Sequence, residues 1–171
     1  MKRISGNFPA VCLVLVLGFG PGLHAQASGA LLHKRAPEFV RADLSGRKID
    51  LKEYRGKVVL LSFWATWCAP CQVELPKFDG WQKNYGSQGL QVLAVSMDDN
   101  EPPVRRTVHR LHLDFPVVMG DAELGEQYGG VLGLPVTYLV NREGRVVAEF
   151  KGGTDLNAME ARVRRVLSSG N

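Results

Sequence analysis

The stretch FWATWCAPC, residues 63–71, places two of the chain's three cysteines three positions apart. A Cys68–Cys71 bridge would close a loop of four residues. It would restrict the unfolded chain by about 2 kcal/mol, against about 3 kcal/mol for a fifteen-residue loop. The pair is therefore poorly placed to stabilise a fold, and its spacing calls for another explanation.

A strand precedes the two cysteines and a helix contains them, as the local pattern predicts. The run Val58–Ala65 is apolar on both faces, which is typical of a central strand covered from both sides. A helix is expected to begin just after Thr66, a plausible cap, with Pro70 in its first turn. Cys68 would lie at the positive end of the helix dipole, where a thiolate is favoured over a thiol. We expect Cys68 to be the exposed attacking group and Cys71, one turn deeper on the same face, to attack second.

The other segments alternate between strand and helix patterns. The sequence predicts a hairpin from 39–43 and 48–51, strands over 89–98, 115–119, 136–140 and 145–150, and helices over 101–113, 121–129 and 155–167. This order indicates an α/β domain in which a mixed sheet lies between helices.

The N-terminus has the pattern of a secretory signal peptide over residues 1–27. It combines Lys2 and Arg3 with an apolar run at 11–19 and a small-x-small site at 25–27. The apolar run is about half the roughly 20 residues that a membrane-spanning helix needs. Cleavage is therefore favoured over an uncleaved anchor or a buried N-terminal helix, and we expect a periplasmic or other extracytoplasmic location.

Cleavage after Ala27 would remove Cys12 and leave only the close pair of cysteines. Residues 28–35 would form a flexible leader and 36–171 a single domain. The net charge of +4 would fall to +2, because only two basic residues and no acidic ones are lost. This is too weak a charge to suggest a nucleic-acid partner.

Two other uses of the cysteines are considered. A structural disulfide is disfavoured by its small entropic effect. A zinc site would need two further ligands, and His109 and His112 do not match zinc-finger spacing from Cys71. No metal or other cofactor is therefore expected, and the two histidines are interpreted as surface residues.

With these residues in place, the chain resembles the thioredoxin superfamily, in particular its exported TlpA/ResA-like branch, which includes the cytochrome c maturation thioredoxins. The resemblance covers roughly 36–167 and includes FWATWCAPC, Pro76 and the segment GVLGLPVTYLVNREGRVV at 130–147. It implies a thioredoxin-like fold, with a mixed central β-sheet flanked by helices and an N-terminal β-hairpin extension.

The resemblance also implies roles for residues outside the cysteine pair. Pro135 stands where the family has its cis-proline, so the Leu134–Pro135 bond should be cis and pack against the cysteines. The backbone of Leu134 would then pair with an extended substrate. Trp67 is expected to shield the motif as part of this substrate-binding surface.

Glu74 matches the glutamate that this branch usually keeps beside the buried cysteine. An ordinary surface glutamate near a helix start is the alternative. Thioredoxins proper carry a buried aspartate where this chain has Ser62, and serine cannot exchange a proton near neutral pH. Glu74 is therefore the better candidate for the proton transfer at Cys71.

The predicted function is exported thiol-disulfide exchange with protein disulfides or dithiols. By resemblance, the protein would be a reductant in cytochrome c maturation or related thiol reduction, kept reduced by a membrane electron donor. We expect it to be a monomer. Two alternatives use the same fold: a peroxiredoxin-like antioxidant, whose cysteine lacks a partner two residues on, and a copper chaperone with C-x-x-x-C and a downstream histidine.

Overall fold

The computed structural model describes residues 29–131 and 133–169. The predicted signal peptide, residues 1–27, lies outside the described residues. The elements in chain order are β1 (Val40–Ala42), β2 (Lys48–Asp50), η1 (Leu51–Tyr54), β3 (Val58–Trp64), α1 (Ala69–Tyr85), η2 (Gly86–Gln88), β4 (Leu90–Ser96), α2 (Glu101–Arg110), β5 (Val117–Met119), α3 (Ala122–Gln127), β6 (Val136–Val140), β7 (Val146–Lys151) and α4 (Leu156–Ser168).

The central sheet has five strands in the order β5-β4-β3-β6-β7. The middle strand, β3, runs parallel to β4 and antiparallel to β6. Outside these, β5 is parallel to β4 and β7 is antiparallel to β6. Every residue of β3 is buried, as its continuous apolar run predicts. The predicted mixed sheet and its order of elements are confirmed.

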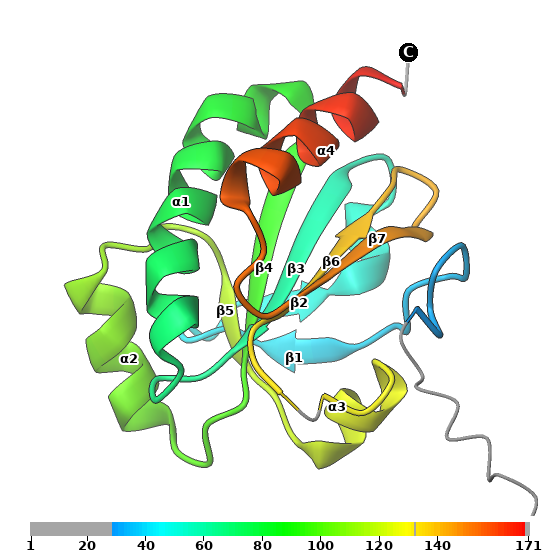
Figure 1. Ribbon diagram of the computed structural model, residues 1–171. Helices are drawn as coiled ribbons and strands as arrows, with labels where there is room; N and C mark the ends of the chain where they lie inside the picture. The colour runs from blue at the N-terminus through cyan, green and yellow to red at the C-terminus, as the bar shows by residue number, and fades with distance from the viewer. Residues whose placement is uncertain (1–28, 132, 170–171) are drawn as a thin grey trace, which may run out of the picture.

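Helices flank the sheet (Figure 1), and a cluster of hydrophobic side chains lies on each of its faces. One cluster joins the sheet to α1 and α4 through side chains that include Leu75, Phe78, Met159 and Val163. The other joins it to α3 and the N-terminal segment through side chains that include Phe39, Ile49, Leu124 and Tyr128. The sheet therefore has a separate core on each face, as a thioredoxin-like fold was expected to have a sheet flanked by helices.

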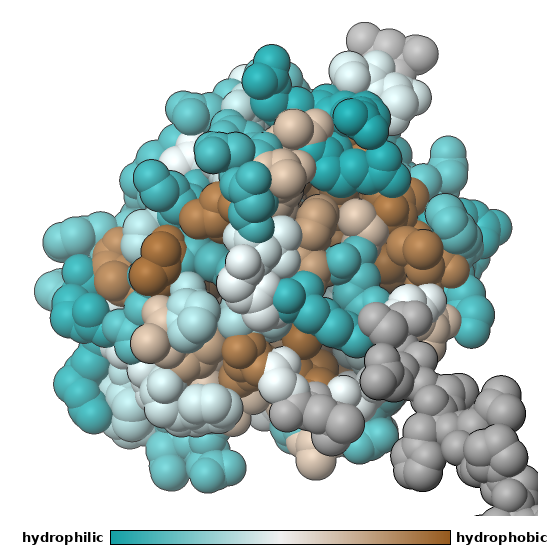
Figure 2. Space-filling view, viewed as in Figure 1, coloured by the Kyte–Doolittle hydropathy of each residue, from teal (hydrophilic) through white to brown (hydrophobic). Residues whose placement is uncertain are grey.

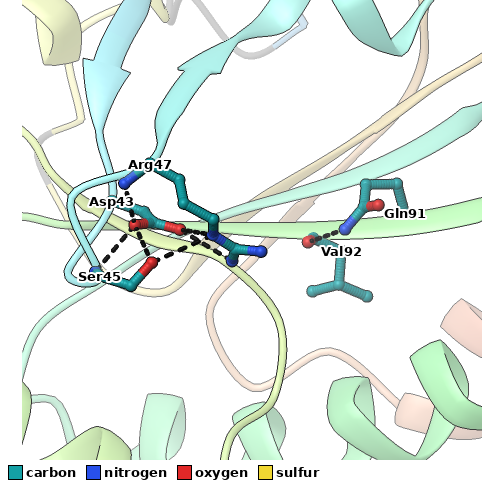
Figure 3. Close-up of polar contacts among 5 residues, drawn as sticks. All are labelled: Asp43, Ser45, Arg47, Gln91 and Val92. Atoms are coloured by element: carbon teal, nitrogen blue, oxygen red, sulfur yellow. Dashed lines mark hydrogen bonds and ion pairs between the residues drawn. The ribbon is translucent and has the colours of Figure 1, made fainter.

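The N-terminal hairpin, β1 and β2, forms its own two-stranded antiparallel sheet. Its turn is organised by Asp43, whose carboxylate accepts hydrogen bonds from the backbone N–H groups of Ser45 (2.8 Å) and Arg47 (2.9 Å) and pairs with the Arg47 guanidinium (Figure 3). Leu44 N–H donates to the Val117 carbonyl at 2.9 Å. The predicted hairpin extension is thus attached to the edge of the main sheet at β5.

Residues 29–35, expected to form a flexible leader, lie along the edge strand β7. His33 N–H donates to the Val146 carbonyl at 2.7 Å, and Val146 N–H donates to the Lys34 carbonyl at 2.9 Å. Gly29 N–H donates to the Glu149 carboxylate at 2.8 Å. The flexibility of the leader stays a prediction.

Below α4, apolar side chains of β7 remain partly exposed (Figure 2).

Helix α1 also protects an incomplete sheet edge. Strand β5 pairs only with the last part of β4, from Ala94 on, so the backbone of the earlier part has no strand on that side. Gln82 occupies this edge: its side-chain oxygen accepts from Val92 N–H at 2.7 Å, and its amide N–H donates to the Leu90 carbonyl at 3.3 Å. The side chain of the preceding residue, Trp81, is buried in the core.

Candidate active site

The two cysteines form a disulfide at the N-terminal end of α1. Their Cα atoms are 5.3 Å apart. Cys68 is the N-cap residue, and its sulfur accepts a hydrogen bond from Cys71 N–H at 3.3 Å. A free backbone N–H and the positive end of the helix dipole favour negative charge on that sulfur. The geometry thus fits a pair in which Cys68 carries the thiolate when the bond opens.

Two expectations about this segment need correction. The helix begins at Ala69 and not just after Thr66, because the sulfur of Cys68 takes the capping position that Thr66 was expected to fill. Cys68 is also buried in this disulfide form, with 4% of its surface exposed against 1% for Cys71. Cys71 is the more shielded of the two, but the prediction of an exposed Cys68 is wrong for this state.

Thr66 is instead held by a residue far along the sequence. Asp98, just after β4, accepts hydrogen bonds from Thr66 N–H at 2.9 Å and from the Thr66 hydroxyl at 2.5 Å. Ser96 also donates its hydroxyl to Asp98, at 2.7 Å. On the other side of the loop, the Gln72 amide donates to the Thr66 carbonyl at 2.6 Å. These contacts fix the loop that presents the cysteines.

Sequence reasoning missed Asp98 and Gln72. Neither residue belongs to a recognisable sequence motif. Gln72 is six residues from Thr66 in the sequence, and Asp98 is 32 residues from it. The signal available was weak: a strand end followed by Ser-Met-Asp-Asp at 96–99, next to the strand that leads to the cysteines. Parallel neighbours bring their carboxyl ends to the same edge of a sheet, so Asp98 could have been placed near this loop.

Glu74 lies on the buried side of α1, three residues after Cys71, with 5% of its surface exposed. Burial raises the pKa of its carboxyl from 4.5 to about 7, because the charged form is poorly solvated there. No hydrogen bond or ion pair within residues 29–131 and 133–169 involves this carboxyl. A carboxylic acid with a pKa near neutrality can both donate and accept a proton at physiological pH. The alternative of an ordinary surface glutamate is wrong.

Ser62 stands inside the sheet and is hydrogen-bonded away from this chemistry. It is 1% exposed, and its hydroxyl oxygen accepts a hydrogen bond from the Thr137 hydroxyl at 3.1 Å. The side chain therefore has a structural partner on the neighbouring strand β6. Among these two candidates, Glu74 is the group that can exchange a proton near neutral pH.

The segment before β6 contains the expected cis bond. The Leu134–Pro135 peptide is cis, and Pro135 is buried. Leu134 is partly buried and packs against the cluster that includes both cysteines. Trp67 differs in exposure, with 70% of its surface accessible, so the ring projects from the loop beside Cys68. The roles of Trp67, Leu134 and Pro135 toward a substrate stay predictions.

Within the described residues, no three His, Cys, Asp or Glu side chains come together as a metal site. His109 and His112 are exposed at the end of α2, with ring centroids 6.3 Å apart. Across the same part of the chain, none of the helices has the length and apolar character to cross a membrane.

Comparison with known proteins identifies the family. Residues 32–149 match the model of the AhpC/TSA family. The chain belongs to this family. A relative named thiol-disulfide oxidoreductase ResA, from Bacillus thuringiensis subsp. konkukian, is 36% identical over 172 aligned positions, covering 97% of this chain and 99% of the relative. Another relative named ResA, from Bacillus subtilis, is 38% identical over 118 positions, covering 68% of this chain and 65% of the relative.

Solved structures agree with this assignment. A thioredoxin-family thiol:disulfide interchange protein from Chlorobium tepidum superposes with a TM-score of 0.72 at 25% identity, covering 78% of this chain and 95% of that one. The thioredoxin domain of a thiol-disulfide oxidoreductase from Bacteroides vulgatus superposes with a TM-score of 0.69 at 26% identity, covering 77% of this chain and 97% of that one. The chain is a thioredoxin-like thiol-disulfide oxidoreductase.

Proposed function

We propose that this protein is an exported reductant of protein disulfides that cycles between the Cys68–Cys71 disulfide and the dithiol. The observation that carries the proposal is the disulfide itself, placed across the first turn of α1 with a buried acid three residues beyond it. By the resemblance of its sequence, its substrates are apocytochrome c in cytochrome c maturation or other oxidised thiol proteins. A membrane electron donor would return the pair to the dithiol.

The reaction begins with the dithiol. The Cys68 thiolate attacks one sulfur of the substrate disulfide, the substrate S–S bond breaks, and the departing substrate sulfur takes up a proton. Cys71, deprotonated, then attacks Cys68 and releases the second substrate sulfur as a thiol. The substrate has gained two electrons and two protons, and the protein is left with the disulfide seen in the structure.

Glu74 supplies the proton transfer for the buried partner in this scheme. In the ionised form it accepts the proton of the Cys71 thiol before the second attack. In the protonated form it returns a proton to Cys71 when the disulfide is reduced again. A pKa near neutrality serves both directions, since neither form is strongly disfavoured.

The site residues beside the cysteines would bind the substrate. Trp67 offers an exposed aromatic face next to Cys68. Leu134 and Pro135 form the other wall, where the substrate segment would lie extended against the backbone of Leu134. The peroxiredoxin and copper-chaperone alternatives gain no support from the relatives compared above, which carry disulfide-exchange names. We propose that the protein acts as a monomer.

Trapping the mixed disulfide tests this order of attack. Cys71→Ser should accumulate a covalent adduct with a protein disulfide such as insulin, joined through Cys68, because the resolving thiol is missing. Cys68→Ser is the matched control and should form no adduct and reduce no insulin. An adduct of equal yield through Cys71 in the Cys68→Ser variant would contradict the assignment.

Export can be tested separately. The protein expressed with its own N-terminus should be found in the extracytoplasmic fraction, and mass spectrometry should give Ser28 as its first residue. A chain that keeps residues 1–27 in the cytoplasmic fraction would refute export, while the exchange chemistry would be unaffected.

A further inference from the structure

The C-terminal end of α2 is tied to the loop that carries the cysteines. The Arg110 guanidinium donates to the side-chain oxygen of Gln72 at 2.7 Å, and the Gln72 amide donates to the Thr66 carbonyl at 2.6 Å. Gln72 immediately follows Cys71 in α1, and Thr66 immediately precedes Trp67. Two hydrogen bonds therefore place an exposed arginine beside the active-site loop.

Further cations are exposed on the two helices that meet at the Arg110–Gln72 contact, although one carboxylate, that of Asp98, also contacts this loop through Thr66. Arg106 is four residues earlier on α2, so it shares the helix face of Arg110, and both are exposed. Lys77 is exposed on α1. In the described part of the chain, none of these three takes part in an ion pair. Arg105 differs, because it pairs with Glu101.

Two large apolar side chains accompany these cations. Trp67 is 70% exposed and Val73 is 64% exposed. Val73 follows Gln72 and lies four residues before Lys77, on the same face of α1. Exposed aromatic and aliphatic groups next to cations form a surface that can hold a peptide by apolar contact and attract it by charge. We call Trp67, Val73, Lys77, Arg106 and Arg110 the basic rim.

Helix α3 carries exposed acidic residues. In Figure 1 the N-terminal end of α1 lies between α2 on one side and α3 on the other. Helix α3 exposes Glu123 and Glu126, and neither takes part in an ion pair among the described residues.

We propose that the basic rim selects substrates with acidic residues next to the disulfide that is reduced. This inference rests on the proposed function and names the substrate class for it. Complementary charge raises the rate of encounter and fixes the orientation of the substrate, and it is screened by salt. The acidic segment lies over α2, with its disulfide at Cys68 and its apolar neighbours on Trp67 and Val73.

Two disulfide peptides of equal length test the proposal. They differ only in the residues beside the cysteine, which are aspartates in one and lysines in the other. The wild-type protein should reduce the acidic peptide about three- to tenfold faster at low salt. This preference should shrink in 0.5 M NaCl, since the charges are then screened.

Two double variants with the same change of net charge separate local from general effects. Arg106→Glu with Arg110→Glu should abolish or reverse the preference. Arg164→Glu with Arg165→Glu should leave it unchanged, because those arginines lie beside Tyr85 at the other end of α1. Two single variants show whether a damaged loop accounts for the loss. Arg106→Glu alone keeps the Arg110–Gln72 hydrogen bond, and Arg110→Lys keeps the positive charge at position 110.

Each outcome bears on a distinct claim. Equal rates for the two peptides, or an equal effect of both double variants, would overturn the basic rim while leaving the exchange reaction in place. Reduction of neither peptide would overturn the proposed function and this inference with it. A preference lost in the α2 variant alone supports both.

Discussion

Two buried carboxyl groups on α1, Glu74 and Asp79, have similar exposure and different surroundings. Asp79 is 6% exposed, accepts a hydrogen bond from Asp114 N–H at 2.8 Å and pairs with Lys83 at 2.7 Å. The side-chain hydrogen bonds that Lys83 makes with Asp79 and Asp114 raise the pKa of Lys83 to about 12. Glu74 is 5% exposed and has no such partner in the described chain, and its pKa is raised to about 7.

The presence or absence of hydrogen-bond and ion-pair partners distinguishes these two buried carboxyl groups. A buried carboxylate with a full set of partners holds two segments together. A buried carboxyl without partners costs stability when it ionises, and its pKa approaches the range in which protons are exchanged. On α1, Asp79 thus has a structural role, while Glu74, in the turn after the cysteines, keeps a carboxyl whose pKa lies near neutrality.

The largest effect on stability is expected at the paired carboxyl. Asp79→Ala removes the acceptor of a backbone N–H and an ion pair, so it should lower the free energy of unfolding by about 3 kcal/mol in urea denaturation. Asp99→Ala, at an exposed position, is the control and should change it little. If Asp79→Ala lowers the free energy of unfolding no more than Asp99→Ala does, Asp79 does not have the structural role described here.

A smaller effect of opposite sign is expected at Glu74. The folded pKa lies above the unfolded value, so the folded state binds the proton more tightly, and stability falls as pH rises from about 4.5 through about 7. Glu74→Gln removes this dependence. The variant should therefore be more stable than the wild type at pH 8, by on the order of 2 kcal/mol, and the advantage should disappear near pH 5.

The matched control for this measurement is Glu126→Gln, an exposed glutamate of α3. Its stability should follow the wild type across the whole pH range. If Glu74→Gln shows the same pH profile as Glu126→Gln, the carboxyl is not held in its buried, destabilised form.

The smallest effect is expected in the loop before the cysteines. Thr66→Val removes one hydrogen bond to Asp98 and leaves the backbone contact, so the cost should be about 1 kcal/mol. Thr154→Val is the control, because that hydroxyl bonds only to nearby carbonyls on the surface. A slower reaction with insulin in Thr66→Val alone would show that the loop positions the cysteines; equal rates would limit Asp98 to a structural role.

Local sequence was enough for the parts of this molecule that depend on neighbours in the chain. The apolar run of β3, the hairpin and the position of the cysteines at a helix start follow from periodicity and spacing. The cis bond before Pro135 came from the resemblance. The burial of Glu74 could be suspected only because the resemblance indicated a role for it.

The strand order could have placed Asp98 near the cysteine loop, but the individual side-chain pairings across the fold could not be predicted from the sequence. Thr66 has good capping chemistry, yet its hydroxyl bonds to Asp98, 32 residues away, and the cap passes to Cys68. Arg110 reaches Gln72 over 38 residues. Such pairings depend on how helices and loops meet over the sheet, which no local pattern specifies.

The central claim is that the Cys68–Cys71 disulfide exchanges with Glu74 as its proton carrier, and one rate comparison tests it most directly. The oxidised protein is reduced with a phosphine from pH 5 to 9, and each variant is compared with the wild type at the same pH. We predict that the wild type exceeds Glu74→Gln by about tenfold below pH 6 and equals it above pH 8, because only a protonated Glu74 supplies the departing Cys71 with its proton. The ratio of the wild-type rate to the rate of the control variant Asp79→Asn should not change with pH. A ratio to Glu74→Gln that does not change with pH would contradict the account.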